Sequence, residues 1–267
     1  MRFVPFLFYD VIMQQVLDFG ACVDIVMMRD LLRPIFPRPT DRPQLDLLAQ
    51  LIRSLLGSRT RDAVSWQAYW DLVGRFPDWA DLACAPVAEI EAIIGNVTFA
   101  DDKAKRIVET LQQIMTLRGE YRLKFLAELP VEAGLAWLRR LKGVGPKIAA
   151  ATLNFSIGQG SAFVVDTHIL RVLQRFGMIG PNADIDRAFQ VVMSATRGWS
   201  ADELQELHFL LKRLGQTWCR HSIAECGLCP LQSRCQRRTC TEQKMPHVAK
   251  SPAPLGAGAY DQLREQY

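Results

Sequence analysis

The stretch Leu141-Lys142-Gly143-Val144-Gly145-Pro146-Lys147 is the most informative part of the sequence for the fold, because it joins two helical segments through a glycine turn. Gly143 and Gly145 permit a tight turn in which backbone N–H groups point outward together. Pro146 suits the first position of a helix, and the alanine-rich run after it continues that helix. A helix N-terminus behind a glycine turn can bind a phosphate without recognising any base. Glycine turns between helices are also common in proteins without that function, so the turn alone does not establish DNA binding.

Apolar residues recur at helical spacing on both sides of this turn. Such faces are formed by Leu48, Leu51, Ile52 and Leu55, by Ile107, Leu111 and Ile114, and by Leu204, Leu207, Leu211 and Leu214. Gly57 is placed to end the first of these helices, and Ser200 with Glu203 forms a capping box that begins the last. No segment alternates convincingly at a period of two, so the sequence predicts an all-α fold without a sheet.

The composition is that of an ordinary globular protein of one large domain or two small ones. The chain has 267 residues, of which 49% are hydrophobic and 22% charged, and its net charge of +4 permits nucleic-acid binding without requiring it. No apolar run approaches the ~18 residues that a membrane span needs. We expect residues 1–27 to form an N-terminal extension of unknown role rather than a signal peptide, and residues 241–267 to form a disordered tail.

Four of the seven cysteines lie close together near the C-terminus. Cys219, Cys226, Cys229 and Cys235 follow the spacing C-x6-C-x2-C-x5-C, and nothing indicates secretion, so we expect a reducing compartment and a metal site rather than disulfides. Four thiolates can hold either a tetrahedral zinc ion or a four-iron cluster. Only the middle two cysteines form a C-x2-C pair, which favours the larger cluster over zinc.

Arginines surround the cysteine-rich loop, namely Arg220, Arg234, Arg237 and Arg238. A compact ligated loop that carries arginines can dock on phosphates. The same residues can also form a solvated basic rim, and charge alone does not separate these interpretations.

Lys147 falls in the first turn of the helix that follows the glycine turn. The positive end of the helix dipole and partial burial both disfavour its charged form, and a neutral amine can attack carbon and build a Schiff base. Taken alone, the residue is better explained as a surface lysine or one that grips phosphate.

Asp166 begins another helical segment, in the run Val164-Val165-Asp166-Thr167-His168. As a structural residue, Asp166 or Thr167 would cap that helix. As a functional residue, a carboxylate at the mouth of a cleft could stabilise a sugar that is losing its base and accept a proton from an attacking amine. These roles are compatible, whereas His168 is better explained as a structural hydrogen-bonding residue.

These features, in this order, resemble the endonuclease III family of DNA glycosylases. The similarity covers the chain from about Leu45 to Cys235, and it rests on the glycine turn, on the segment Val165 to His168 and on the cysteine spacing. The resemblance implies a two-lobed all-α fold with DNA crossing the cleft between the lobes. It also implies a six-helix barrel lobe over residues 44–159 and a lobe with a [4Fe–4S] cluster built from residues 28–43 and 160–240.

The resemblance also implies roles for single residues. Lys147 matches the family's Schiff-base nucleophile and Asp166 its catalytic carboxylate. Gly143, Val144 and Gly145 become the DNA-binding turn, with Arg220 and Arg234 as further expected DNA contacts. Cys219, Cys226, Cys229 and Cys235 become the cluster ligands.

The sequence departs from the family pattern where the family contacts the lesion. Arg59 stands near the position of a glutamine that fills the hole left by the flipped base. The loop from Gly95 to Lys103 is lengthened, with Val97 and Phe99 as candidate wedge residues. The 19-residue spacing from Lys147 to Asp166 is one longer than usual, which we expect the loop at residues 158–160 to absorb.

The expected activity is base excision repair by a bifunctional DNA glycosylase and abasic-site lyase that acts on damaged or mismatched pyrimidines. The alternatives are a monofunctional glycosylase for mismatched or alkylated bases and a non-catalytic DNA-binding module. The expected partner is double-stranded DNA with a damaged or mismatched base, and we expect a monomer without a membrane partner in a bacterial-type cytoplasm, associated with the nucleoid.

Overall fold

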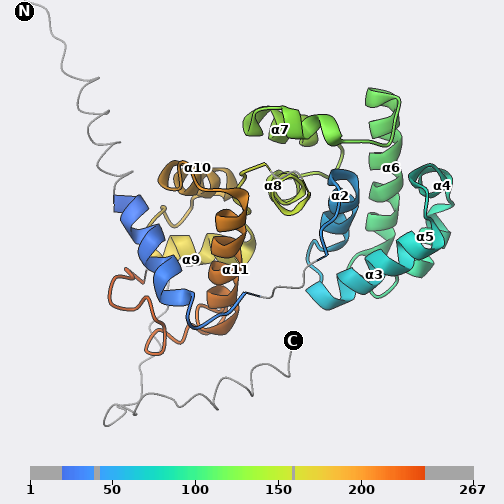
Figure 1. Cartoon of the computed structure of the whole chain (residues 1–267). Helices are drawn as coiled ribbons and strands as arrows, with labels where there is room; N and C mark the ends of the chain where they lie inside the picture. The colour runs from blue at the N-terminus through green and yellow to red at the C-terminus, as the bar shows by residue number, and fades with distance from the viewer. Residues whose placement is uncertain (1–19, 39–42, 158–159, 238–267) are drawn as a thin grey trace, which may run out of the picture.

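The computed structural model describes residues 20–38, 43–157 and 160–237, and within these ranges the chain forms helices and no strand (Figure 1). Two isolated bridges, Leu45 with Ser156 and Cys219 with Ala224, are the extended pairings in this part of the chain. The all-α prediction is therefore confirmed. The predictions for most of the N-terminal extension, for residues 158–159, for Arg238 and for the tail lie outside the described residues.

The first described helix includes residues 20–32. The elements that follow are α2 (Leu47–Leu56), α3 (Asp62–Arg75), α4 (Trp79–Cys84), α5 (Val87–Ile93), α6 (Ala100–Arg118), the 3-10 helix η1 (Lys124–Glu128), α7 (Val131–Leu138), α8 (Pro146–Phe155), α9 (Thr167–Phe176), α10 (Ile185–Ala195) and α11 (Ala201–Thr217). None of the helices described is long and apolar enough to cross a membrane.

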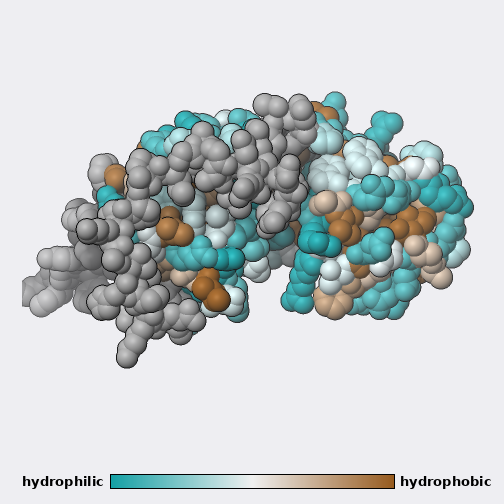
Figure 2. Space-filling model, turned by 90° about the horizontal axis from the view of Figure 1, so that it is seen from below, coloured by the Kyte–Doolittle hydropathy of each residue, from teal (hydrophilic) through white to brown (hydrophobic). Residues whose placement is uncertain are grey.

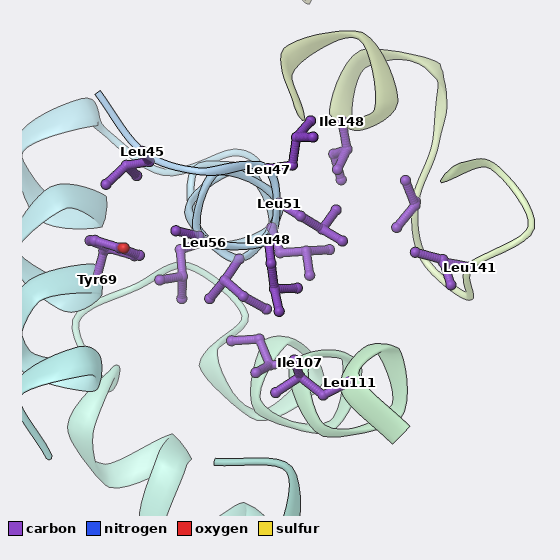
Figure 3. Close-up of a cluster of buried hydrophobic side chains, with 14 of the residues drawn as sticks. Leu45, Leu47, Leu48, Leu51, Leu56, Tyr69, Ile107, Leu111, Leu141 and Ile148 are labelled. Atoms are coloured by element: carbon purple, nitrogen blue, oxygen red, sulfur yellow. The ribbon is translucent and has the colours of Figure 1, made fainter. Parts of the chain in front are cut away.

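The helix α2 lies at the centre of the first of two hydrophobic cores (Figure 3). It packs against α3, α6 and α8, and nine of its ten residues are buried, with Leu51 and Ile52 fully so. Burying such side chains contributes about 1.5–3 kcal/mol each. Asp46 caps the helix by accepting from the Ala49 N–H at 2.8 Å, and the helix ends at Gly57, as the sequence predicts.

The second core is built from both ends of the chain. The helix that includes residues 20–32 contributes Ile25, Met28 and Leu32, which pack with apolar side chains of α9, α10 and α11. The capping box of Ser200 and Glu203 begins α11 as predicted. The boundary placed at residue 28 is too late, because Ile25, in the same helix and before that boundary, is fully buried in this core.

An extended segment joins the two cores and contributes to both. Ala162 and Val164 are buried in the first core, whereas Phe163 and Val165 are buried in the second. Successive side chains of an extended chain point in opposite directions, so these four residues pack two side chains into each core. The segment ends at Asp166, which is thereby fixed at the junction of the two lobes.

Candidate active site between the two lobes

The glycine turn of residues 141–147, hereafter the hairpin, has the geometry that the sequence predicts, with one difference. Gly143 adopts a φ of 82°, which favours glycine, and a Cβ on Gly145 would meet nothing within 4 Å, so a ligand can approach the backbone there. Pro146 is the first residue of α8. Val144 differs from the expectation, because its side chain is buried and its N–H donates to the Leu141 carbonyl at 3.1 Å. It holds the turn together instead of pointing outward.

The hairpin is fixed from outside by α6. The Gln113 side chain accepts from the Lys142 N–H at 2.9 Å and donates to the Arg140 carbonyl at 3.1 Å. The Lys142 ammonium lies 3.0 Å from the Glu109 carboxylate. These contacts fix the position of the hairpin along the axis of α6. The distance between the hairpin and the loop that precedes α6, which carries Phe99, is therefore fixed as well.

Lys147 lies in the first turn of α8, partly buried between the lobes. Burial is the largest influence on its ammonium and lowers its pKa, and the positive charges of Lys212 and Arg53 act in the same direction. Asp166 and Asp62 oppose this effect without overcoming it. The amine is therefore neutral more often than that of an ordinary lysine, which is the property that a nucleophile needs.

Asp166 is 5% exposed and caps α9, accepting from the Ile169 N–H at 2.9 Å. Burial alone would raise its pKa. The opposing influences of His208, the Ile169 N–H and Lys147 are together stronger, so the pKa of Asp166 lies below the ordinary value. The side chain is thus an ionised carboxylate. It caps α9, and its negative charge acts on the amine of Lys147, the candidate nucleophile.

His168 and its neighbours fix how α9 approaches α11. The His168 Nδ1 lies 3.1 Å from the Arg171 guanidinium, which also donates to the Cys219 and Gly215 carbonyls at 2.8 Å. A Cβ on Gly215 would lie 2.9 Å from the His168 Cβ, so the close helix contact needs glycine. His168 is a structural hydrogen-bonding residue in this geometry, as the sequence predicts.

Residues near Lys147 include several that no motif in the sequence indicated. His208 in α11 is buried, burial lowers its pKa to about 4, and its Nδ1 lies 2.7 Å from the Val164 carbonyl. Lys212 in the same helix pairs with Asp62 of α3 at 2.6 Å, a contact that joins the two lobes beside Lys147. The signal for His208 was its position on the otherwise apolar face of α11.

The two expected wedge loops lie against each other. Arg59 is exposed and its guanidinium lies 5.9 Å from the centre of the Phe99 ring, which is 53% exposed. Phe99 therefore remains a candidate for insertion into DNA. Val97 does not, because its side chain is 3% exposed and belongs to the first core.

The four predicted ligand cysteines line one small cavity together with Arg175 and Trp218. No group of three or more metal-binding side chains in the described ranges converges closely enough for a single metal ion. Four cysteine sulfurs around one cavity are a donor set that either a four-iron cluster or a zinc ion takes.

The surroundings of these cysteines suit thiolates that bind a charged group. Burial raises the pKa of Cys229 to about 11 and also raises that of Cys235, so these sulfurs are thiols unless a positively charged metal centre binds them. The buried Arg175 lies 3.6 Å from the Cys219 sulfur, and its Nε is a buried atom with no partner among the described residues. The donor set therefore fits an iron–sulfur cluster.

The arginines of this loop are engaged within the protein. Arg220 pairs with Glu225, and Arg234 lies 3.0 Å from the carboxylate of Asp24. Both side chains remain about half exposed, so they can still contribute positive charge to the surface. Because exposed ion pairs of this kind are weak, these carboxylates do not prevent a phosphate contact, and the role of both arginines in DNA binding stays a prediction.

The two lobes thus form a helix-hairpin-helix protein with a lysine and a carboxylate at their junction. Figure 2 shows a notch in the outline of the molecule between the two groups of helices. The chain belongs to the HhH-GPD superfamily of base excision DNA repair proteins, whose model matches residues 52–195. The resemblance to endonuclease III, inferred from the hairpin and cysteine motifs, is confirmed.

The chain is also similar to individual DNA glycosylases and to solved structures of this fold. A protein of Arabidopsis thaliana named as a candidate DNA glycosylase is 32% identical over 143 residues, 54% of this chain and 48% of that protein, so the chain spans about half of its length. Endonuclease III of Bacillus subtilis is 25% identical over 71% of this chain and 80% of its own. The structure of a trapped endonuclease III–DNA covalent intermediate superposes with a TM-score of 0.66 at 22% identity, over 81% of this chain and 96% of that one.

Proposed function

We propose that this protein is a bifunctional DNA glycosylase, which removes a base and then cuts the strand through Lys147. The observation that carries the proposal is the pairing at the lobe junction, where burial lowers the pKa of Lys147 while the ionised Asp166 lies close enough to influence it. A monofunctional glycosylase needs the carboxylate and an activated water but has no use for a lysine made neutral by burial.

The proposed reaction begins with extrusion of the target nucleotide into the notch between the lobes, at a cost of a few kcal/mol that a damaged or mispaired base lowers. The hairpin holds the flanking phosphate through the exposed backbone of Gly145 and the start of α8. The ionised Asp166 stabilises positive charge that develops on the sugar.

Covalent chemistry then follows at C1′ of the deoxyribose. The neutral Lys147 Nζ forms a bond to C1′ as the bond to the base breaks, and the bonding electrons leave with the base, which takes up a proton. Asp166 accepts a proton from the attacking amine. Opening of the sugar ring yields a Schiff base, whose C2′ proton is lost as the C3′–O bond breaks, and the strand is cut 3′ to the lesion.

The cysteine loop would hold a [4Fe–4S] cluster through Cys219, Cys226, Cys229 and Cys235. Such a cluster would supply a rigid cross-link for the C-terminal part of the second lobe, which otherwise packs few apolar side chains besides Leu231. Arg171 and Arg175 connect this loop to α9 through its backbone carbonyls, and Asp166 begins α9. The loop would thereby brace the helix that carries the catalytic carboxylate.

We further propose that the substrate is double-stranded DNA with a damaged or mismatched pyrimidine and that the enzyme acts as a monomer. The superposed structure is a trapped endonuclease III–DNA covalent intermediate, which supports covalent chemistry in a protein of the same fold. Another protein of this fold is a thymine-DNA glycosylase, which supports mismatched pyrimidines among the candidates.

Incision of defined duplexes tests the proposal. The panel holds an abasic site, thymine glycol, dihydrouracil, uracil opposite guanine and thymine opposite guanine. We expect incision of the abasic duplex and of at least one base-containing duplex without added alkali. Base loss that is converted to a break only after alkali would instead show a monofunctional glycosylase, and binding without base loss or incision would show a DNA-binding module.

A further inference from the structure

The lysine at position 103 of α6 is buried and serves no step of the reaction proposed above. It is 4% exposed, on the face of α6 that otherwise buries Ala104, Ile107, Leu111 and Ile114. A lysine in such a position is unusual, since long charged side chains rarely lose their contact with water unless they are fully paired. Its pairing therefore indicates what it is for.

The Lys103 ammonium holds the loop that connects α2 to α3. Its Nζ donates to the Leu56 carbonyl at 2.8 Å, to the Ser58 carbonyl at 2.6 Å and to the Thr60 hydroxyl at 2.9 Å. These acceptors lie at the C-terminal end of α2, where carbonyl groups lack helical partners and carry the negative end of the helix dipole. All three donors of the ammonium are thus used within five residues that include Arg59.

The same lysine and the same threonine also hold the loop that precedes α6. The Thr60 hydroxyl, which accepts from the Lys103 ammonium at 2.9 Å, also accepts from the Thr98 N–H at 3.2 Å. The loops that carry Arg59 and Phe99 are therefore joined through one buried group. Arg59 and Phe99, hereafter the wedge pair, meet above it with the guanidinium 5.9 Å from the ring centre.

Both residues of the wedge pair have strained backbones. Arg59 has a φ of 55° and Phe99 a φ of 59°, and the one other non-glycine residue with a positive φ in the described ranges is Arg237. Such conformations are unfavourable for residues with a Cβ and persist only where the surroundings impose them, most often at functional sites. The contacts of Lys103 and Thr60 hold the residue that precedes each of them, Ser58 before Arg59 and Thr98 before Phe99.

The position of the wedge pair is suited to DNA. Burial lowers the pKa of Lys103, and the positive charge of Lys147 acts in the same direction, so the two ammonium groups lie in the same part of the molecule. The helix α6 also holds the hairpin through Gln113, ten residues further on, which corresponds to about 15 Å along a helix. An exposed aromatic ring can insert between neighbouring bases of DNA. An arginine beside it can contact the base left unpaired when its partner is extruded.

We propose that Lys103 is a positioning residue that holds Arg59 and Phe99 as one wedge, at a distance from the hairpin set by α6, so that the enzyme discriminates lesion-containing from undamaged duplexes. This inference rests on the proposed function, because a wedge is needed only where a nucleotide is extruded. Lys103 itself touches neither the DNA nor the reacting atoms, and it acts through the wedge pair.

Binding measurements test this role without depending on the lyase reaction. The full chain is titrated with two duplexes, an undamaged one and one with a tetrahydrofuran abasic analogue opposite 2-aminopurine, and the ratio of the two dissociation constants is the discrimination. We expect Lys103→Met to lower this ratio roughly tenfold and to abolish the change in 2-aminopurine fluorescence, because misplacing a positioned group by an ångström has effects of this size or larger. Affinity for the undamaged duplex should stay as in the wild type, since the hairpin is intact.

Three comparisons separate positioning from general damage to the fold. Lys105→Met changes an exposed lysine on the same helix and should leave the ratio unchanged. Lys103→Arg keeps a charged donor and should retain part of the discrimination. In a variant that already carries Arg59→Ala and Phe99→Ala, adding Lys103→Met should cause no further loss.

Several results would overturn the proposal. Full discrimination by a folded Lys103→Met protein would do so, as would an equal loss of affinity for both duplexes or an additive effect in the Arg59→Ala, Phe99→Ala background. Should Lys103→Met not fold, Thr60→Val removes the hydroxyl that joins the two loops and must lower the ratio instead. A wild type that binds both duplexes equally would contradict the proposed function itself, a result distinct from all of these.

Discussion

Burial lowers the pKa of two lysines of this protein, Lys103 and Lys147, and we propose different functions for them. Lys103 lies under the loops at the ends of α2 and α6, and burial lowers its pKa to about 8. Lys147 lies at the lobe junction, and burial lowers its pKa as well. A lowered pKa thus marks both residues, although we propose only Lys147 as a nucleophile.

The partners of the two amines make the difference. The Lys103 Nζ has three acceptors in hydrogen-bond range, so neither a free lone pair nor a path to substrate remains. Lys147 is surrounded by charges instead, with Asp166 and Asp62 opposed by Lys212 and Arg53. Perturbed pKa values indicate functional sites only together with access and geometry.

The strongest loss of activity is expected at the nucleophile. Lys147→Gln should reduce incision of an abasic duplex by roughly 10³-fold or more, because removing a covalent catalyst leaves only binding and electrostatic contributions. Affinity for the same duplex should change little. Lys103→Gln serves as the control, and it should affect discrimination more than incision of a duplex that already lacks the base. Equal incision by wild type and Lys147→Gln would contradict the assignment.

Asp166→Asn should reduce base removal by about 10²-fold or more, the size typical of a lost general base or charge stabiliser. Asparagine caps helices as well as aspartate does, so the fold should be retained. Asp184→Asn is the matched control, because Asp184 caps α10 in the same way, with its carboxylate 2.8 Å from the Arg187 N–H. Single-turnover base release from the best substrate is the measurement, and similar rates for the two variants would reduce Asp166 to a cap.

Cys226→Ser should lower the iron and sulfide content of the purified protein and its melting temperature, because a cluster bound only by the folded state stabilises that state. Cys84→Ser, at an exposed cysteine outside the cavity, should change neither. Metal analysis and thermal unfolding provide the readout. Zinc in place of iron, or unchanged stability after loss of the metal, would contradict the bracing role of the cysteine loop.

The smallest effects are expected from Lys212 and Asp62, the ion pair that joins the lobes. Replacing them should shift the pH dependence of the incision rate in opposite directions. Lys212 lowers and Asp62 raises the pKa of Lys147. Because the neutral amine is the reactive form, Lys212→Met should move the rise of incision rate to higher pH, and Asp62→Asn should move it to lower pH. Rate profiles on an abasic duplex measure this, and shifts in the same direction for both variants would show that the pair acts only by holding the lobes together.

Local signals in the sequence were sufficient for much of this structure. The helix starts at Pro146, Asp166 and Ser200 depend on residues within one helical turn, and the cysteine spacing depends on neighbours along the chain. The lobe boundary at Ile25 and the burial of Val97 depend on which surfaces meet in space, and no spacing along the chain encodes that.

Lys103 shows the same limit at the candidate site. Its acceptors lie 43 to 47 residues away, so nothing near it in the sequence indicates them. One signal was present, because Lys103 falls in register with Ile107 and Ile114 on the buried face of α6. A lysine on an apolar face predicts a buried partner, although it does not say which one.

Mapping the trapped lysine distinguishes directly between the two buried amines. Wild type is incubated with an abasic duplex and borohydride, the covalent adduct is digested with protease, and the modified peptide is sequenced by mass spectrometry. We predict a single adduct on Lys147, with Lys103 unmodified. An adduct on Lys103 or on another lysine, or no adduct despite tight binding of the duplex, would contradict the assignment of Lys147 as the nucleophile.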